Sequence, residues 1–171
     1  FNDLAVCALL ARERHGCSRV VVLDLDVHQG DGTATILAGE KCVVTISVHC
    51  AQNFPFRKTA SDHDIAVESG VGDEEYLSVV DDAMELVEQY EPDLLLFQAG
   101  VDGLAEDALG RLELSRNGMR YRNKRVFDYV LDKEVPCVVF MGGGYSKPIH
   151  HTLDSLMDLF RGAAHANYLL S

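Results

Sequence analysis

Basic residues are scarce in this 171-residue chain: 15 lysines and arginines stand against 27 aspartates and glutamates, for a net charge of −12. Electrostatically driven nucleic-acid binding needs a basic face, so this balance argues against it. No apolar run approaches the roughly 20 residues of a membrane span. The five cysteines form no CxxC pair and no secretory apolar segment opens the chain. We therefore expect a reducing, intracellular compartment, the nucleus or the cytoplasm first.

The apolar pattern alternates between strand-like and helix-like segments. Short Val- and Leu-rich runs predict buried strands, and apolar residues at helical spacing predict helices. The expected strands are 19–25, 42–48, 94–99 and 135–141; the expected helices are 3–15 (capped near Asn2 or Asp3 and ended by Gly16), about 32–38, 73–90 (capped by Asp73), 115 to about 134, and a last one opened by Pro148. Residues 49–72 are predicted to be irregular. This alternation predicts an α/β fold whose parallel sheet is covered by helices on both faces.

Chemically active side chains follow the strands. Asp24, Asp26 and His28 close the first strand, and Asp102 follows the third. Because the carboxyl ends of parallel strands share one edge of the sheet, we expect these groups to converge. A catalytic metal ion needs three protein ligands and an open position, and Asp26, His28 and Asp102 form such a set. For the DxDxH spacing alone, an ordinary helix-capping Asp and a surface His are an equally good reading. The AGVDGLAEDALG segment at a second strand end favours metal.

Further residues are predicted to support this site. Asp24 and Asp31 flank the ligands and suit groups that orient histidines, although Asp31-Gly32 is also a good turn dipeptide. His49 is expected near the rim of the pocket, and Asp107 and Gly110 are expected to form a turn that supports the Asp102 loop. The MGGGY segment allows close backbone approach and presents Tyr145, whose hydroxyl suits a developing oxyanion.

Four ordered segments, DLDVHQGDGTA, SVHCAQNFPF, FQAGVDGLAEDALGRLELS and MGGGYS, resemble the metal-dependent histone deacetylase superfamily, which includes acetylpolyamine amidohydrolases and acetoin-utilisation proteins. The resemblance extends over essentially the whole chain. Gln29, where many nuclear members carry a second His, and the short 32–42 connection are similar to bacterial-type or class IV members.

The resemblance implies roles for individual residues. By motif they are zinc ligands Asp26, His28 and Asp102; a transition-state tyrosine, Tyr145; acids that hold the family's two catalytic histidines, Asp24 and Asp31; a structural potassium site formed by Asp24, Asp26, His28, Ser47 and Val48; and tunnel residues Phe54 and Gly143. Because one imidazole and two carboxylates are an oxygen-rich set, Fe²⁺ and Mn²⁺ also suit the zinc position.

The family's tandem histidines have no counterpart here, since the sole HH pair, at 150–151, follows the tyrosine motif. We therefore expect residues 1–171 to be the C-terminal portion of a single deacetylase-like domain that lacks the N-terminal part of the fold, with weak or no activity alone. General acid–base groups typically supply about 10²–10⁴-fold in rate.

Two functions of different classes follow. The first is a zinc-dependent amidohydrolase that removes acetyl groups from acetyl-lysine of histones or other proteins, or from a related acetylated amine such as a polyamine. The second is a catalytically inactive, truncated module for binding or dimerisation. A third, arginase-like reading with two metals ranks low, because no acid stands two residues after His28.

Overall fold

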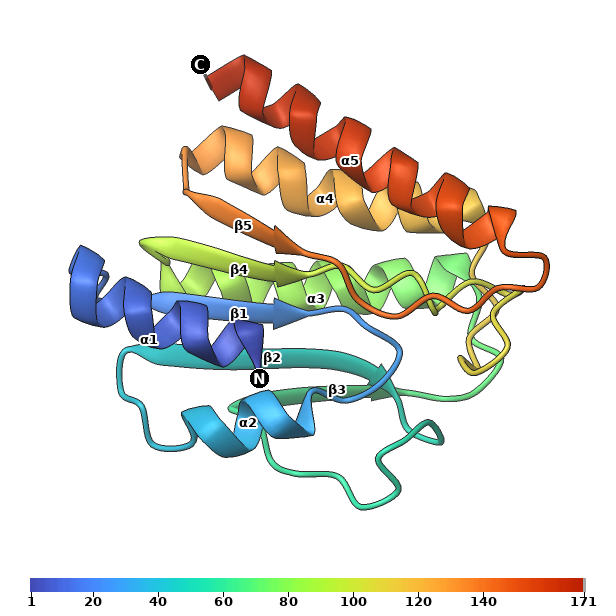
Figure 1. Ribbon diagram of the computed structural model, residues 1–171, viewed down its shortest axis with the longest axis horizontal. Helices are drawn as coiled ribbons and strands as arrows, with labels where there is room; N and C mark the ends of the chain where they lie inside the picture. The colour runs from blue at the N-terminus through green and yellow to red at the C-terminus, as the bar shows by residue number, and fades with distance from the viewer. Residues whose placement is uncertain (171) are drawn as a thin grey trace.

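A computed structural model of the chain describes residues 1–170 (Figure 1). Strands and helices alternate along it as the sequence predicts, except over residues 43–67, where two strands follow one another. The elements are α1 (Asp3–His15), β1 (Val20–Asp24), α2 (Asp31–Leu37), β2 (Val43–Cys50), β3 (His63–Val67), α3 (Asp73–Tyr90), β4 (Leu94–Gln98), α4 (Arg116–Lys133), β5 (Cys137–Phe140) and α5 (His150–Leu170). None of the described helices combines the length and the apolar character needed to cross a bilayer.

The five strands form one parallel sheet in the order β3-β2-β1-β4-β5. The predicted fold class is confirmed, but the expectation of four strands is wrong. The missed strand, β3, lies within the segment predicted to be irregular, and it pairs only with β2. Its sequence, HDIAV, opens with two polar residues, and the strand is partly exposed as far as the buried Val67. Edge strands often carry such charged residues, which removes the apolar signal that marks central strands.

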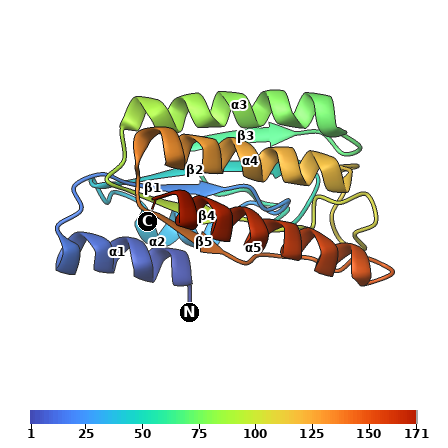
Figure 2. The same cartoon turned by 90° about the horizontal axis from the view of Figure 1, so that it is seen from above.

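Each face of the sheet has its own apolar core, because successive side chains of a strand point to opposite faces. Val20 and Val22 pack against α1, whereas Val21 and Leu23 pack in the larger core that α3 and α4 cover. Figure 2 shows α1 below the sheet and α3 and α4 above it, with α5 beside α4. Helices therefore cover both faces, as predicted.

Helix ends follow local chemistry with two corrections. Asn2 caps α1 by accepting a hydrogen bond from Ala5 N, and Gly16 ends the helix in the left-handed conformation. The N-cap of α3 is Gly72, so Asp73 is its first residue rather than its cap. Pro148 precedes α5 by two residues and does not open it.

The strand order places a reversal between β1 and β4. The chain moves outward from β1 through β2 to β3, then returns across the sheet to β4 on the other side of β1. At such a switch point the loops that follow neighbouring strands diverge and leave a crevice at the carboxyl ends, where open α/β sheets bind ligands. The residues that follow β1 and β4 are those predicted to bind metal.

Candidate metal centre

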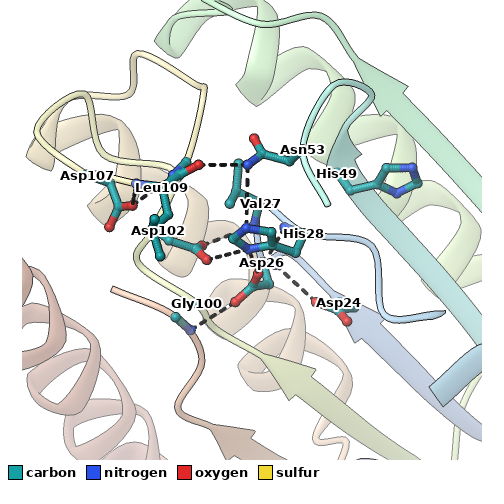
Figure 3. Close-up of polar contacts among 12 residues, drawn as sticks. Asp24, Asp26, Val27, His28, His49, Asn53, Gly100, Asp102, Asp107 and Leu109 are labelled. Atoms are coloured by element: carbon teal, nitrogen blue, oxygen red, sulfur yellow. Dashed lines mark hydrogen bonds and ion pairs between the residues drawn. The ribbon is translucent and has the colours of Figure 1, made fainter. Parts of the chain in front are cut away.

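The structure brings Asp26, His28 and Asp102 together at this switch point (Figure 3). One candidate ligand atom from each residue lies within 4.8 Å of the other two. His28 Nδ1 lies 3.1 Å from Asp26 Oδ1 and 3.0 Å from Asp102 Oδ2. Both aspartates are buried, and His28 is half-buried. The three side chains thus face a common point, with the imidazole on the open side.

Main-chain donors fix the two carboxylates in place. Asp102 Oδ1 accepts a hydrogen bond from Val27 N at 3.0 Å, which links the β4 loop to the β1 loop. Asp26 Oδ1 accepts from His28 N at 2.9 Å, and its Oδ2 accepts from Gly143 N at 3.0 Å. Each carboxylate is therefore held in one orientation by an amide outside its own strand end.

Glycine is required where backbones meet these carboxylates. A Cβ atom on Gly143 would collide with the carboxylate of Asp102, and one on Gly100 would collide with that of Asp26. The close backbone approach predicted for the GGG turn is confirmed. It leaves the carboxylates no room to rotate away from His28.

The cluster contains more acidic than basic groups, because the carboxyls of Asp24, Asp26 and Asp102 surround the single imidazole of His28. Hydrogen bonds with Asp102 and Asp26 raise the pKa of His28 to about 10. Burial raises the pKa of Asp102 to about 6. Burial, and then the charge of Asp26, raise the pKa of Asp24 well above its usual value. Burial also opposes ionisation of Asp26, but hydrogen bonds from His28 and Gly143 prevail and lower its pKa. A bound cation would relieve this concentration of acids.

The donor set fits a divalent metal ion. Ligand atoms that share a tetrahedral zinc at the usual bond lengths lie roughly 3.3 Å apart, and the two measured Nδ1–oxygen distances, 3.0 and 3.1 Å, are close to this. Three protein ligands leave a fourth position for substrate or water. The oxygen-rich set accepts iron or manganese as well.

Asp24 and Asp31 line a cavity of about 370 Å³, together with Asp26 and His28. Asp24 is buried and accepts a hydrogen bond from Asp26 N at 3.1 Å. Asp31 and Gly32 are the first two residues of helix α2 rather than a separate turn, and Asp31 accepts a hydrogen bond from Gly32 N. Phe140 and Met141, at the end of β5, form part of the opposite wall.

The predicted potassium-site residues of β2 are buried. Ser47 Oγ lies 3.0 Å from His49 Nδ1, and Val48 is fully covered. The expectation that His49 lies at the pocket rim is wrong: its side chain is 2% exposed and points away from the three ligands (Figure 3). It is part of strand β2, which extends two residues beyond its predicted end.

Tyr145 is exposed, and its main chain is fixed by Asp107, whose Oδ2 accepts from Tyr145 N at 2.6 Å. The other oxygen of Asp107 accepts from Leu109 N and Gly110 N, both at 2.8 Å. The predicted turn around Asp107 and Gly110 is thus confirmed. Phe54 is exposed and packs edge-on against Phe56, with ring centroids 6.1 Å apart.

Two residues near the site were missed by sequence reasoning. Asn53 is buried; its Nδ2 lies 3.4 Å from His28 Nε2 and donates to Leu109 O. Arg122, from α4, is 1% exposed and donates to main-chain carbonyls beneath the two strand ends. Neither has a local sequence signal, because the partners that connect each residue to the site lie more than 20 residues away along the chain.

Residues 1–158 match the histone deacetylase domain family. The chain belongs to this family. The match covers nearly all of the described chain, including β1, β4, β5 and the loops that carry the three candidate ligands. The resemblance inferred from the four ordered motifs is therefore confirmed.

Relatives and a solved structure show how much of the family fold this deacetylase-family chain contains. It is 40% identical over 150 residues to an uncharacterized protein of Picosynechococcus, covering 87% of this chain and 50% of that protein. It is 34% identical to histone deacetylase 2 of Arabidopsis thaliana over 166 residues, covering 94% of this chain and 43% of the relative. An acetylpolyamine aminohydrolase from Burkholderia pseudomallei superimposes with a TM-score of 0.79 at 23% identity, covering 95% of this chain and 49% of that one. The chain thus spans about half the length of the proteins it matches.

Proposed function

We propose that residues 1–171 are the metal-binding, C-terminal portion of a deacetylase domain. The complete domain removes acetyl groups from acetylated amines. The observation that carries the proposal is the buried Asp26, His28 and Asp102 cluster, in which one imidazole nitrogen faces two carboxylates at about 3 Å. Membership of the histone deacetylase family supports the reaction class.

In this proposal Asp26, His28 and Asp102 hold Zn²⁺, or Fe²⁺ or Mn²⁺ in its place. Bound there, the ion would act as a Lewis acid toward an amide carbonyl. Tyr145, exposed beside the Asp107 turn, donates a hydrogen bond to the oxyanion that develops on the substrate. Asp24 and Asp31 line the same cavity and orient the family's catalytic histidines.

The proposal also includes a structural cation site, a substrate tunnel and a class of substrate. A structural K⁺ is held by Asp24, Asp26, His28, Ser47 and Val48, partly through backbone oxygens, while Phe54 and Gly143 line the substrate tunnel. The substrate is an acetylated protein, peptide or polyamine, encountered inside the cell. The net charge of −12 suits such partners better than nucleic acid.

The test separates metal binding from turnover. Zinc binding by the purified chain is measured by calorimetry, and hydrolysis of a fluorogenic acetyl-lysine peptide is measured with and without a chelator. The proposal expects one tightly bound zinc per chain, lost in Asp102→Ala. Absence of zinc binding in a folded chain would contradict it.

A second candidate function, for residues 1–171 taken alone, is a catalytically inactive binding or dimerisation module. Stoichiometric zinc without any chelator-sensitive turnover supports this candidate. Chelator-sensitive turnover by the chain alone excludes it.

A further inference from the structure

Arg122 is a buried cation that donates hydrogen bonds to several carbonyl oxygens. Its side chain is 1% exposed, and its described contacts include no ion pair with a carboxylate. Burying an arginine without a paired acid is unfavourable. Its Nε and Nη2 donate to Asn123 Oδ1 at 3.1 and 2.8 Å, and its Cζ lies 5.8 Å from the ring centroid of Phe97. Because its burial is unfavourable, we expect Arg122 to have a role beyond packing.

The remaining donors of Arg122 reach both sides of the switch point. Nη1 donates to Gly100 O at 2.6 Å and to Leu25 O at 3.2 Å. Leu25 directly precedes the candidate ligand Asp26, and Gly100 lies two residues before Asp102. One nitrogen thus connects the segments that carry the two metal-binding carboxylates.

This connection lies where the sheet no longer holds the strands together. The β1–β4 register ends at Asp24 and Gln98, and the last main-chain link is Leu25 N to Gln98 O at 3.1 Å. Beyond it the two loops diverge, and their inward-facing carbonyls need donors from elsewhere. Arg122 supplies these donors from α4, and Tyr76 of α3 adds a weaker one to Leu25 O at 3.4 Å.

We propose that Arg122 is a positioning residue of the metal centre: by joining the carbonyls of Leu25 and Gly100, it holds Asp26 and Asp102 at metal-binding separation. The direct link between the two loops, Val27 N to Asp102 Oδ1, depends on the same spacing. This inference rests on the proposed metal centre.

Zinc affinity of four variants tests the proposal, measured by competition with a chromophoric chelator and scaled to the folded fraction from circular dichroism. Arg122→Met is expected to weaken zinc binding roughly 10-fold to 100-fold, the range typical of groups that support metal ligands, and to alter the absorption spectrum of bound Co²⁺. Arg122→Lys, which keeps the charge and a donor, is expected to recover part of the affinity. Arg125→Met, which removes a half-buried arginine that pairs with Asp81 of α3, is expected to keep the parent affinity. Leu159→Ala, a core truncation in α5, controls for lost stability.

Hydrogen exchange in the metal-free chain provides a second measurement that needs no bound metal. The Val27 amide is expected to exchange faster in Arg122→Met and Arg122→Lys than in Leu159→Ala at equal global stability. If Arg122→Met does not fold, Tyr76→Phe removes the weaker donor to Leu25 O and is expected to shift Val27 exchange in the same direction by less.

The outcomes separate the two proposals. Unchanged Val27 exchange in the Arg122 variants overturns the positioning role, as does a loss of zinc affinity in Leu159→Ala equal to that in Arg122→Met. If the parent chain binds no zinc, the proposed metal centre fails, and Val27 exchange still decides whether Arg122 sets the spacing of the two loops.

Discussion

Aspartates hold both ends of the central β1–β4 pair, but the two ends differ in what surrounds the carboxylates. At the amino end, Asp93 Oδ2 accepts hydrogen bonds from Ser18 N at 2.8 Å, Ser18 Oγ at 2.7 Å and Arg19 N at 2.9 Å. These bonds, from Ser18 first and then Arg19, lower the pKa of Asp93 to about 2. This carboxylate is matched by donors, and it stabilises the fold.

At the carboxyl end the same residue type is surrounded by other acids. Burial raises the pKa of Asp24 well above its usual value and that of Asp102 to about 6. One half-buried imidazole is shared by two carboxylates. The fold holds these acids close together, and a bound cation would reduce the repulsion among their charges. The two ends thus differ in that the Asp93 carboxylate is surrounded by hydrogen-bond donors, whereas the carboxylates at the other end are surrounded by acids.

Removing a ligand at the carboxyl end has the largest expected effect. Asp102→Ala takes away one of three candidate ligands, and we expect metal binding to fall beyond the roughly 100-fold that supporting groups cost. Tyr145→Phe removes only an exposed hydroxyl, so it should keep the metal and lower catalysis in a complete enzyme. Metal content of both purified variants checks this. Loss of metal in Tyr145→Phe would contradict the role assigned to that tyrosine.

Crowding the carboxyl end has the next largest effect. In Gly143→Ala the new methyl group collides with the Asp102 carboxylate. We expect destabilisation of about 1–3 kcal/mol, as for other overpacked sites, together with weaker zinc binding. The matched control is Gly32→Ala in α2, where the nearest atom to a new Cβ is 3.5 Å away. Urea denaturation and zinc titration of both variants measure the difference, and equal behaviour would show that the glycine turn does not constrain Asp102.

The sequence allowed prediction of what depends on short-range pattern. Asp26 and His28 follow one buried strand, and Asp102 follows its neighbour, so parallel topology was enough to bring them together. The support given by Asp107 followed from its turn position three residues before Gly110.

Features that depend on distant partners were missed. Strand β3 is defined by pairing with β2 rather than by an apolar run of its own. Arg122 occurs in RYRNKR, where basic residues suggest a solvated helix face, and only the packing of α4 beneath the switch point shows that it is buried. Burial of a polar residue is a property of the assembled layers, so local sequence does not reveal it.

Neutralising one acid at the carboxyl end should stabilise the metal-free chain. In Asp24→Asn the side-chain oxygen still accepts from Asp26 N, but the buried charge is gone. The pKa of Asp24 is raised in the folded chain, so ionisation destabilises that state as pH rises above about 4. At pH 8 we expect a gain of about 1 kcal/mol or more, or roughly 2–4 °C in Tm for a chain of this size. Thermal denaturation in the presence of a chelator measures it, and a lower Tm than the parent's would contradict this account.

The same substitution at the amino end should have the opposite sign and the smallest effect. Asp93→Asn loses the charge that three donors match, so we expect a lower Tm than the parent's near neutral pH. Because folding lowers the pKa of Asp93 from 3.8 to about 2, its contribution is complete above about pH 4 and is lost as pH falls toward about 2. The gap in Tm between Asp93→Asn and the parent should therefore close over that interval, while Asp82→Asn, at an exposed position of α3, shows no such closing gap. A gap that persists at pH 2 would mean that Asp93 acts through neutral hydrogen bonds alone, and the contrast between the two ends of the strands would then not be one of charge.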